Sequence, residues 1–134
     1  LPCYDLAQGL VWPCFADCHT HLDKGHTWLR NPNPNGTFDA ALEAAAADHR
    51  HWSAADLYPR MSFGLRCSYA HGTQAVRTHL DCLDGQEKIS FAVFDRLRQE
   101  WADRLTLQAV CLVSMDYYDR PEAENLANTV AQYG

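Results

Sequence analysis

The sequence predicts an α/β fold with parallel strands, and two patterns lead to that prediction. Three runs rich in apolar and β-favouring residues, 12–21, 74–80 and 105–113, alternate with longer runs in which apolar residues recur at helical spacing. Strands that alternate with helices form right-handed βαβ units, so we expect the strands to lie side by side in chain order. Three such units make up the first part of a (β/α)8 barrel of the TIM type, because a closed barrel takes about 250 residues.

The first strand is predicted within the run LVWPCFADCHTH, residues 10–21, where apolar residues lead into a sharply polar end. Such a run is typical of a buried parallel strand. Residues 30–37 (RNPNPNGT) are predicted to form a loop, because each Asn-Pro pair disfavours helix before the proline. Thr37 is a candidate N-cap for an alanine-rich helix over residues 38–52.

A second helix is predicted to begin at Ser53 and to end at His71-Gly72. Its apolar residues recur at four-residue spacing and share one face: Leu57, Met61 and Leu65. A short strand, TQAVRTHLD, follows at residues 73–81.

The second half of the chain repeats strand and helix. Residues 89–104 are predicted to form a helix with an apolar stripe, which consists of Phe91, Phe94, Leu97 and Trp101. Residues 105–114 are the most strand-like run of the chain. Residues 120–134 are predicted to form a final helix, with Pro121 at its first position.

Composition limits the class of partner. The 134 residues, 47% hydrophobic and 21% charged, fit one globular domain. A net charge of −6 with 11 scattered basic residues argues against nucleic-acid binding, so we expect a small-molecule partner. No signal peptide or membrane-spanning run is visible, and we therefore expect a cytoplasmic protein with no membrane partner. The six cysteines form no CxxC pair and are expected to be free, mostly buried thiols.

Ionisable residues gather where the first strand ends. Because side chains alternate along a strand, Asp17, His19, His21 and Asp23 are expected on one face. The two imidazoles are then about 6 to 7 Å apart along the strand and can converge on one metal ion, zinc or iron. The carboxyl ends of strands are where ligands bind in α/β folds. The alternative is a pair of surface or hydrogen-bonded histidines.

The second strand has the same arrangement, with Arg77, His79 and Asp81 on one face. Two adjacent strands that present histidine at the same end predict one shared pocket. The alternative is an ion pair between Arg77 and Asp81 that only fills the barrel, with His79 hydrogen-bonded between them.

These residues carry a family resemblance. The stretch GLVWPCFADCHTHLDK, residues 9–24, resembles the first barrel strand of the amidohydrolase superfamily. HTHLDKGHTW, NGTFDAAL and above all YAHGTQAVRTHLD resemble bacterial cytosine deaminases and related enzymes that act on triazines or other nitrogen heterocycles. The resemblance extends over nearly the whole chain.

The resemblance implies a metal-dependent hydrolytic deaminase of a nitrogen heterocycle. His19 and His21 would bind one divalent ion, zinc or iron, and water activated by that ion would attack the ring carbon that bears the amino group. In such enzymes the remaining ligands and the proton-shuttling glutamate lie on later strands. We therefore expect residues 1–134 to be the N-terminal segment of a longer hydrolase barrel, inactive alone. The alternatives are a sister amidohydrolase that cleaves a cyclic or acyclic amide, and an incomplete fragment or half-barrel that forms a homo-oligomer.

Four residues are candidates for substrate binding: His79, Ser114, Asp116 and Lys24. In cytosine deaminases the third strand ends in a glutamine that contacts the pyrimidine amide, and here Ser114 takes that position. One hydroxyl cannot reproduce a two-sided amide contact, so we expect a substrate other than cytosine. Lys24 either holds a substrate carboxylate or pairs with Asp23. Asp116 either contacts a ligand or caps the next turn.

Overall fold

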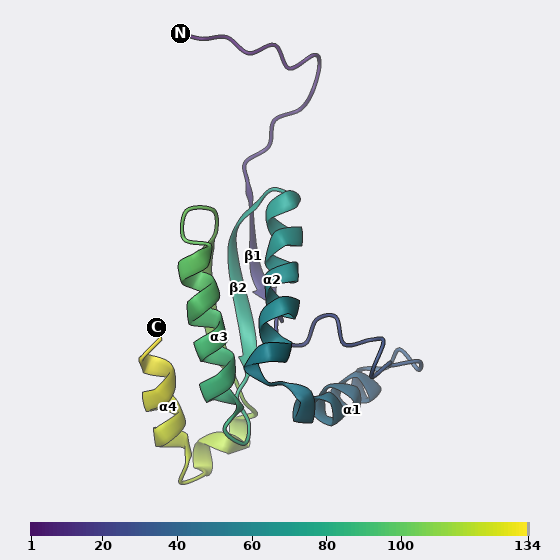
Figure 1. Cartoon of the computed structure of the whole chain (residues 1–134), viewed down its shortest axis with the longest axis vertical. Helices are drawn as coiled ribbons and strands as arrows, with labels where there is room; N and C mark the ends of the chain where they lie inside the picture. Colours follow the sequence, from purple (N-terminus) through teal and green to yellow (C-terminus); the bar gives the residue numbers. More distant parts are fainter. Residues whose placement is uncertain (134) are drawn as a thin grey trace.

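The computed structural model describes residues 1–133 and contains three parallel strands alternating with helices (Figure 1). The elements follow in the order β1 (Phe15–Thr20), α1 (Phe38–Asp48), α2 (Ala54–Ala70), β2 (Thr73–Asp81), α3 (Gln86–Glu100), β3 (Thr106–Leu112) and α4 (Ala123–Ala131). Short 3-10 turns occupy His49–His51 and Met115–Asp119. The sheet has the order β1-β2-β3, and both pairs are parallel, as the sequence predicted.

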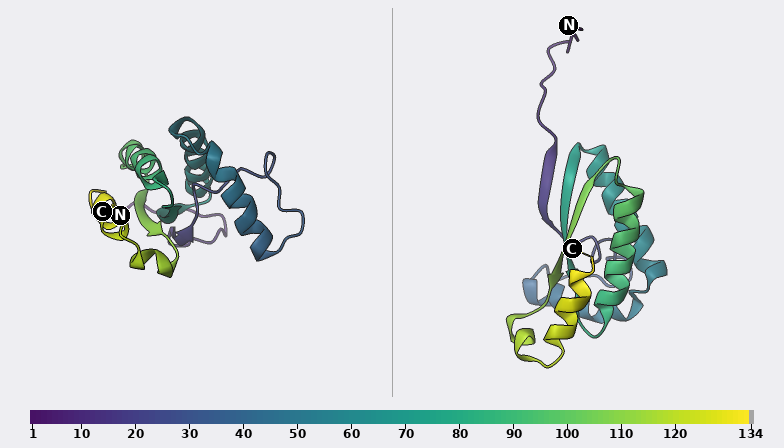
Figure 2. Two further views of the ribbon diagram at one scale, coloured as in Figure 1. Left: turned by 90° about the horizontal axis from the view of Figure 1, so that it is seen from below. Right: turned by 90° about the vertical axis from the view of Figure 1, so that its left-hand side faces the viewer.

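Helices α2 and α3 pack on one face of the sheet and leave the other face open within residues 1–133 (Figure 2). β2 shows this division clearly. Its residues Val76, Thr78 and Leu80 are buried under the helices, while Arg77 on the opposite face is exposed. Residues 1–14 run away from the sheet without regular structure (Figure 1).

The core lies between the sheet and the two covering helices. The apolar faces predicted for α2 and α3 are both buried there, and their side chains are Leu57, Met61, Leu65, Phe91, Phe94 and Leu97. Each buried side chain of this size contributes about 1.5–3 kcal/mol relative to an exposed one. The core therefore holds β2 and β3 against the helices, and β1 joins them through its parallel pairing with β2.

The predicted helix ends are mostly confirmed. The Thr37 hydroxyl accepts from the amide of Ala40, and the Ser53 hydroxyl accepts from the amide of Asp56. Gly72, with φ of 83°, follows the end of α2. The prediction for Pro121 is wrong: α4 begins at Ala123, and Glu122 is its N-cap. Arg120 before the proline is extended, as a residue before proline usually is, and a turn then precedes the helix.

Two burial predictions are also wrong. No residue of β1 is buried, because β1 is an edge strand whose open face has no covering element in residues 1–133. The six cysteines are free, but only Cys82 is buried, and Cys3, Cys14 and Cys18 are exposed. No helix in residues 1–133 is long and apolar enough to cross a membrane.

Candidate functional site

Three histidines come together at the carboxyl ends of β1 and β2. The rings of His19 and His79 stack with centroids 4.0 Å apart. The ring of His21 lies 5.3 Å from His19 and 5.8 Å from His79, measured between centroids. The parallel register, in which Thr20 pairs with Thr78, brings these residues together. The sequence predicted the proximity of these three residues.

The hydrogen bond of His21 determines which of its nitrogens is free. Its Nδ1 lies 3.0 Å from the carbonyl oxygen of His79, and a carbonyl only accepts, so Nδ1 carries the proton. Nε2 then keeps its lone pair, which is the usual state of a metal-binding imidazole. The Nε2 lone pair of His21 is therefore available to a cation.

Burial favours the neutral form of two of the imidazoles, those of His21 and His79. It lowers the pKa of His21, with a further lowering from Lys24, and it lowers the pKa of His79, with further lowering from His19 and His21. Nδ1 of His79 is buried and has no hydrogen-bond partner among the described residues. Neutral imidazole is the form that binds metals. The donor set thus fits a divalent ion, although no group of three or more His, Cys, Asp or Glu in residues 1–133 is arranged to hold one.

The acidic and basic residues that follow the histidines pair differently from the sequence expectation. Nζ of Lys24 lies 2.8 Å from Oδ1 of Asp81, so Lys24 does not pair with Asp23. Arg77 donates to the Gln108 side chain at 2.9 and 3.1 Å, so the alternative pair of Arg77 with Asp81 does not form. The ion pair beside the histidines is thus the one between Lys24 and Asp81.

Asp23 is fully buried just beyond the end of β1. Its Oδ2 accepts from the amide of Asp81 at 2.8 Å, while its Oδ1 has no partner among the described residues. Burial raises the pKa of Asp23 to about 6. The strand ends at Thr20, so the alternation that placed Asp23 on the histidine face does not extend to it.

A cavity of about 470 Å³ lies at the strand ends and brings together Lys24, Asp81 and Ser114. Its opposite wall is formed by α1, through Leu42, Ala45 and Ala46 with His49 just beyond the helix. Ser114 lies two residues past the end of β3. That α1 forms this wall was not predictable from the sequence, because the irregular loop before the helix leaves its position in the fold undetermined.

Asp116 does not line this cavity. It is exposed, lies 3.3 Å from the guanidinium of Arg120, and has its pKa lowered first by the Ser114 hydroxyl and then by Arg120. The six candidates therefore fall into three places. His19, His21 and His79 form one cluster, and Lys24 and Ser114 line the neighbouring cavity, which none of the three histidines lines. Asp116 belongs to neither.

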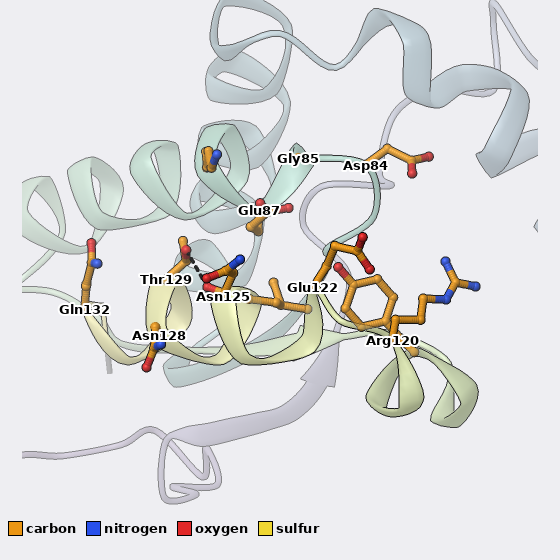
Figure 3. A pocket seen from close by; sticks show the side chains of 12 residues that line it. Asp84, Gly85, Glu87, Arg120, Glu122, Asn125, Asn128, Thr129 and Gln132 are labelled. Carbon is orange, nitrogen blue, oxygen red and sulfur yellow. Dashed lines mark hydrogen bonds between the residues drawn. The ribbon is translucent and has the colours of Figure 1, made fainter.

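A larger cavity, about 740 Å³, lies between the start of α3 and α4 (Figure 3). Its lining is mostly polar and includes Glu87, Asn125, Asn128 and Gln132. None of the three histidines lines it. Asn125 and Asn128 lie three residues apart on α4, and this spacing indicates from the sequence that they share one polar face of the helix.

Comparison with known proteins identifies the family, although no family model matches the chain. The chain is 54% identical over 114 residues to a pterin deaminase of Rhizobium rhizogenes, a match that covers 84% of this chain and 26% of that protein. It is 25% identical over 127 residues to an N-isopropylammelide isopropyl amidohydrolase of Pseudomonas sp. strain ADP, covering 91% of this chain and 32% of that protein. The chain belongs to the amidohydrolase superfamily.

A solved structure of similar fold supports the architecture. The structure of 5-methylcytosine deaminase from Klebsiella pneumoniae, liganded with 5-fluorocytosine, matches with a TM-score of 0.77 and 23% identity, over 90% of this chain and 29% of that one. The fold class is therefore confirmed as part of an amidohydrolase barrel. The chain spans about a quarter to a third of the length of these amidohydrolase relatives. Members of this superfamily usually depend on a metal ion.

Proposed function

We propose that the intact protein is a metal-dependent hydrolytic deaminase of an aminated nitrogen heterocycle, and that its substrate is a pterin. The histidine cluster at the ends of β1 and β2 is the observation that carries the proposal. Identity of 54% to a pterin deaminase supports the ring class. Ser114, in place of an amide side chain, supports a substrate other than cytosine.

In this proposal His19 and His21 hold one divalent ion, zinc or iron. The chemistry that such an ion supplies is Lewis-acid activation of water near neutral pH. His21 is suited to bind because its Nδ1 is occupied by the carbonyl oxygen of His79 and its Nε2 is free. His79 flanks the pair with a neutral ring that offers a hydrogen-bonding nitrogen to the substrate.

Lys24 and Ser114 orient the heterocycle in the 470 Å³ cavity. The Lys24 ammonium donates to a ring carbonyl or ring nitrogen, and its ion pair with Asp81 holds it at the cavity wall. The Ser114 hydroxyl donates or accepts, so it suits either edge of an amidine. The apolar wall of α1 covers the flat face of the ring.

We also propose that residues 1–134 are the first three β/α units of a closed barrel. Within residues 1–133, β1 and β3 each pair on one side only, so each leaves a free edge for a further strand. Free edges of this kind favour association with other strands. The open face that carries His79 and Arg77 would then line the barrel interior.

The test uses the intact protein with its metal determined by mass spectrometry. Ammonia release from pterin, cytosine and aminated triazines is measured together with dealkylation of N-isopropylammelide. We expect pterin to have the highest kcat/KM, and His19→Asn to abolish turnover while the exposed control His51→Asn leaves it unchanged. Activity on N-isopropylammelide without deamination of any ring would instead support the sister amidohydrolase. Pterin turnover unaffected by His19→Asn would refute the site.

A further inference from the structure

The loop that follows His21 is held from α2 by a buried arginine. Arg60 is 9% exposed, and its Nη1 donates to the carbonyl oxygens of Asp23 and Gly25, the second at 2.9 Å. Among the described residues, neither carbonyl accepts a backbone hydrogen bond. Arg60 therefore satisfies the carbonyl groups of two loop residues that lie beyond the end of β1.

The guanidinium of Arg60 is itself fixed by a charge network. Its Nη2 and Nε donate to Oδ2 of Asp56 at 2.6 and 3.0 Å. Asp56 also binds Arg30 at 2.5 Å, and Arg30 makes a bidentate pair with Asp48 at 2.6 and 2.7 Å. Two arginines and two aspartates thus form a neutral cluster that joins the loop to α1 and α2. Charge-assisted hydrogen bonds of this kind are strong and directional, so Arg60 has little freedom to move.

The same loop is tied to β2 at two further points. The amide of Leu22 donates to the buried Thr78 hydroxyl at 3.0 Å. The Asp23 carboxylate accepts from the amide of Asp81 at 2.8 Å. The segment between His21 and Gly25 is therefore clamped between β2 on one side and Arg60 on the other.

We propose that Arg60 is a positioning residue of the active site. By fixing the backbone of residues 23–25, it sets the directions in which His21 and Lys24 project. The inference rests on the proposed function, in which His21 binds the ion and Lys24 contacts the substrate. Arg60 touches neither, so it acts only through the loop.

The geometry requires a guanidinium rather than any cation. Arg60 spans Asp56 and two carbonyls with a planar fork of donors, whereas a lysine ammonium is a single point with three donors. Arg60→Lys therefore keeps the charge and removes the fork. Arg66→Lys is the matched control, because Arg66 is exposed on the same helix and forms no hydrogen bond or ion pair among the described residues.

Two measurements on the intact protein test the proposal. In the metal-free protein, amide hydrogen exchange at Leu22 and Asp81 should become at least about tenfold faster in Arg60→Lys, since both amides report on the clamped loop. On loading with Co²⁺, affinity should fall about 10–100-fold and the visible absorption bands should shift, as for lost support of a metal ligand. Arg66→Lys should change neither. Asp56→Asn, which weakens the anchor of Arg60, should give a smaller change in the same direction.

Unchanged exchange at both amides, together with unchanged Co²⁺ affinity and bands, would overturn the proposal. A lower melting temperature without faster local exchange would also overturn it, because it would mean a general structural role. If Arg60→Lys does not fold, Asp56→Asn decides by the same two readouts. If the unsubstituted protein binds no divalent ion, the proposed function fails, and the exchange data alone decide whether Arg60 holds the loop.

Discussion

Removing the carboxylate of Asp48 should destabilise the protein by about 2–4 kcal/mol. The Asp48 side chain is 1% exposed and accepts hydrogen bonds from Arg30 and from Nε1 of Trp52, the latter at 2.7 Å. Trp52 is 2% exposed, so alanine at position 48 leaves its N–H buried without an acceptor, which costs about 1–3 kcal/mol. The Arg30 side chain is 36% exposed and regains water, so loss of the bidentate pair adds only about 1 kcal/mol.

The assay is urea unfolding of the intact protein, followed by far-UV circular dichroism, with Asp48→Ala compared with the unsubstituted protein. Asp95→Ala is the control, because Asp95 pairs with Arg98 at 2.7 Å in a more exposed setting and should cost less than about 1 kcal/mol. Equal losses of stability in the two variants would refute the reasoning, since they would show that burial of the Asp48 cluster adds nothing.

Three further predictions concern the site and its surroundings. His21→Asn should abolish turnover and lower metal content, measured by elemental analysis, and a variant that retains both would exclude His21 as a ligand. Ser114→Gln should raise the ratio of kcat/KM for cytosine to that for pterin by about tenfold, and an unchanged ratio would remove Ser114 from specificity. The pKa of Asp56 is lowered from 3.8 to about 2, chiefly by hydrogen bonds from Arg30, so its ionised form stabilises the fold above pH 3.8, and this contribution is lost as pH falls toward 2. After discounting for partial exposure, the ionised Asp56 contributes about 1–2 kcal/mol to the free energy of unfolding. Asp56→Asn should therefore flatten the acid limb of the stability-against-pH curve by that amount. An acid limb as steep as that of the unsubstituted protein would contradict this prediction.

Local patterns predicted the elements well because local interactions decide them. The caps Thr37 and Ser53 and the four-residue spacing in α2 act within one or two turns, and each is confirmed. The alternation in β2 placed Arg77, His79 and Asp81 on one face, and Val76, Thr78 and Leu80 are indeed buried on the other.

The pairing of charges was not predictable in the same way. Lys24 and Asp81 are 57 positions apart in the sequence and meet only because β1 and β2 end together. For Arg60 the sequence indicated only a position within a helix, and nothing in it indicated the loop carbonyl groups to which Arg60 donates. The exposure of β1 was also missed. Its apolar composition is typical of a strand covered on both faces, but no element of residues 1–133 covers its open face.

The alternation in β2 has a consequence for how a protein of this fold changes during evolution. Substitutions at Val76, Thr78 or Leu80 disturb the contact with the helices, whereas substitutions at Arg77 alter only the open face. Packing against the helices and exposure on the open face therefore alternate along one nine-residue strand. A mutational library confined to the odd-numbered positions can explore new ring specificities while the packing that holds the barrel units together is inherited unchanged.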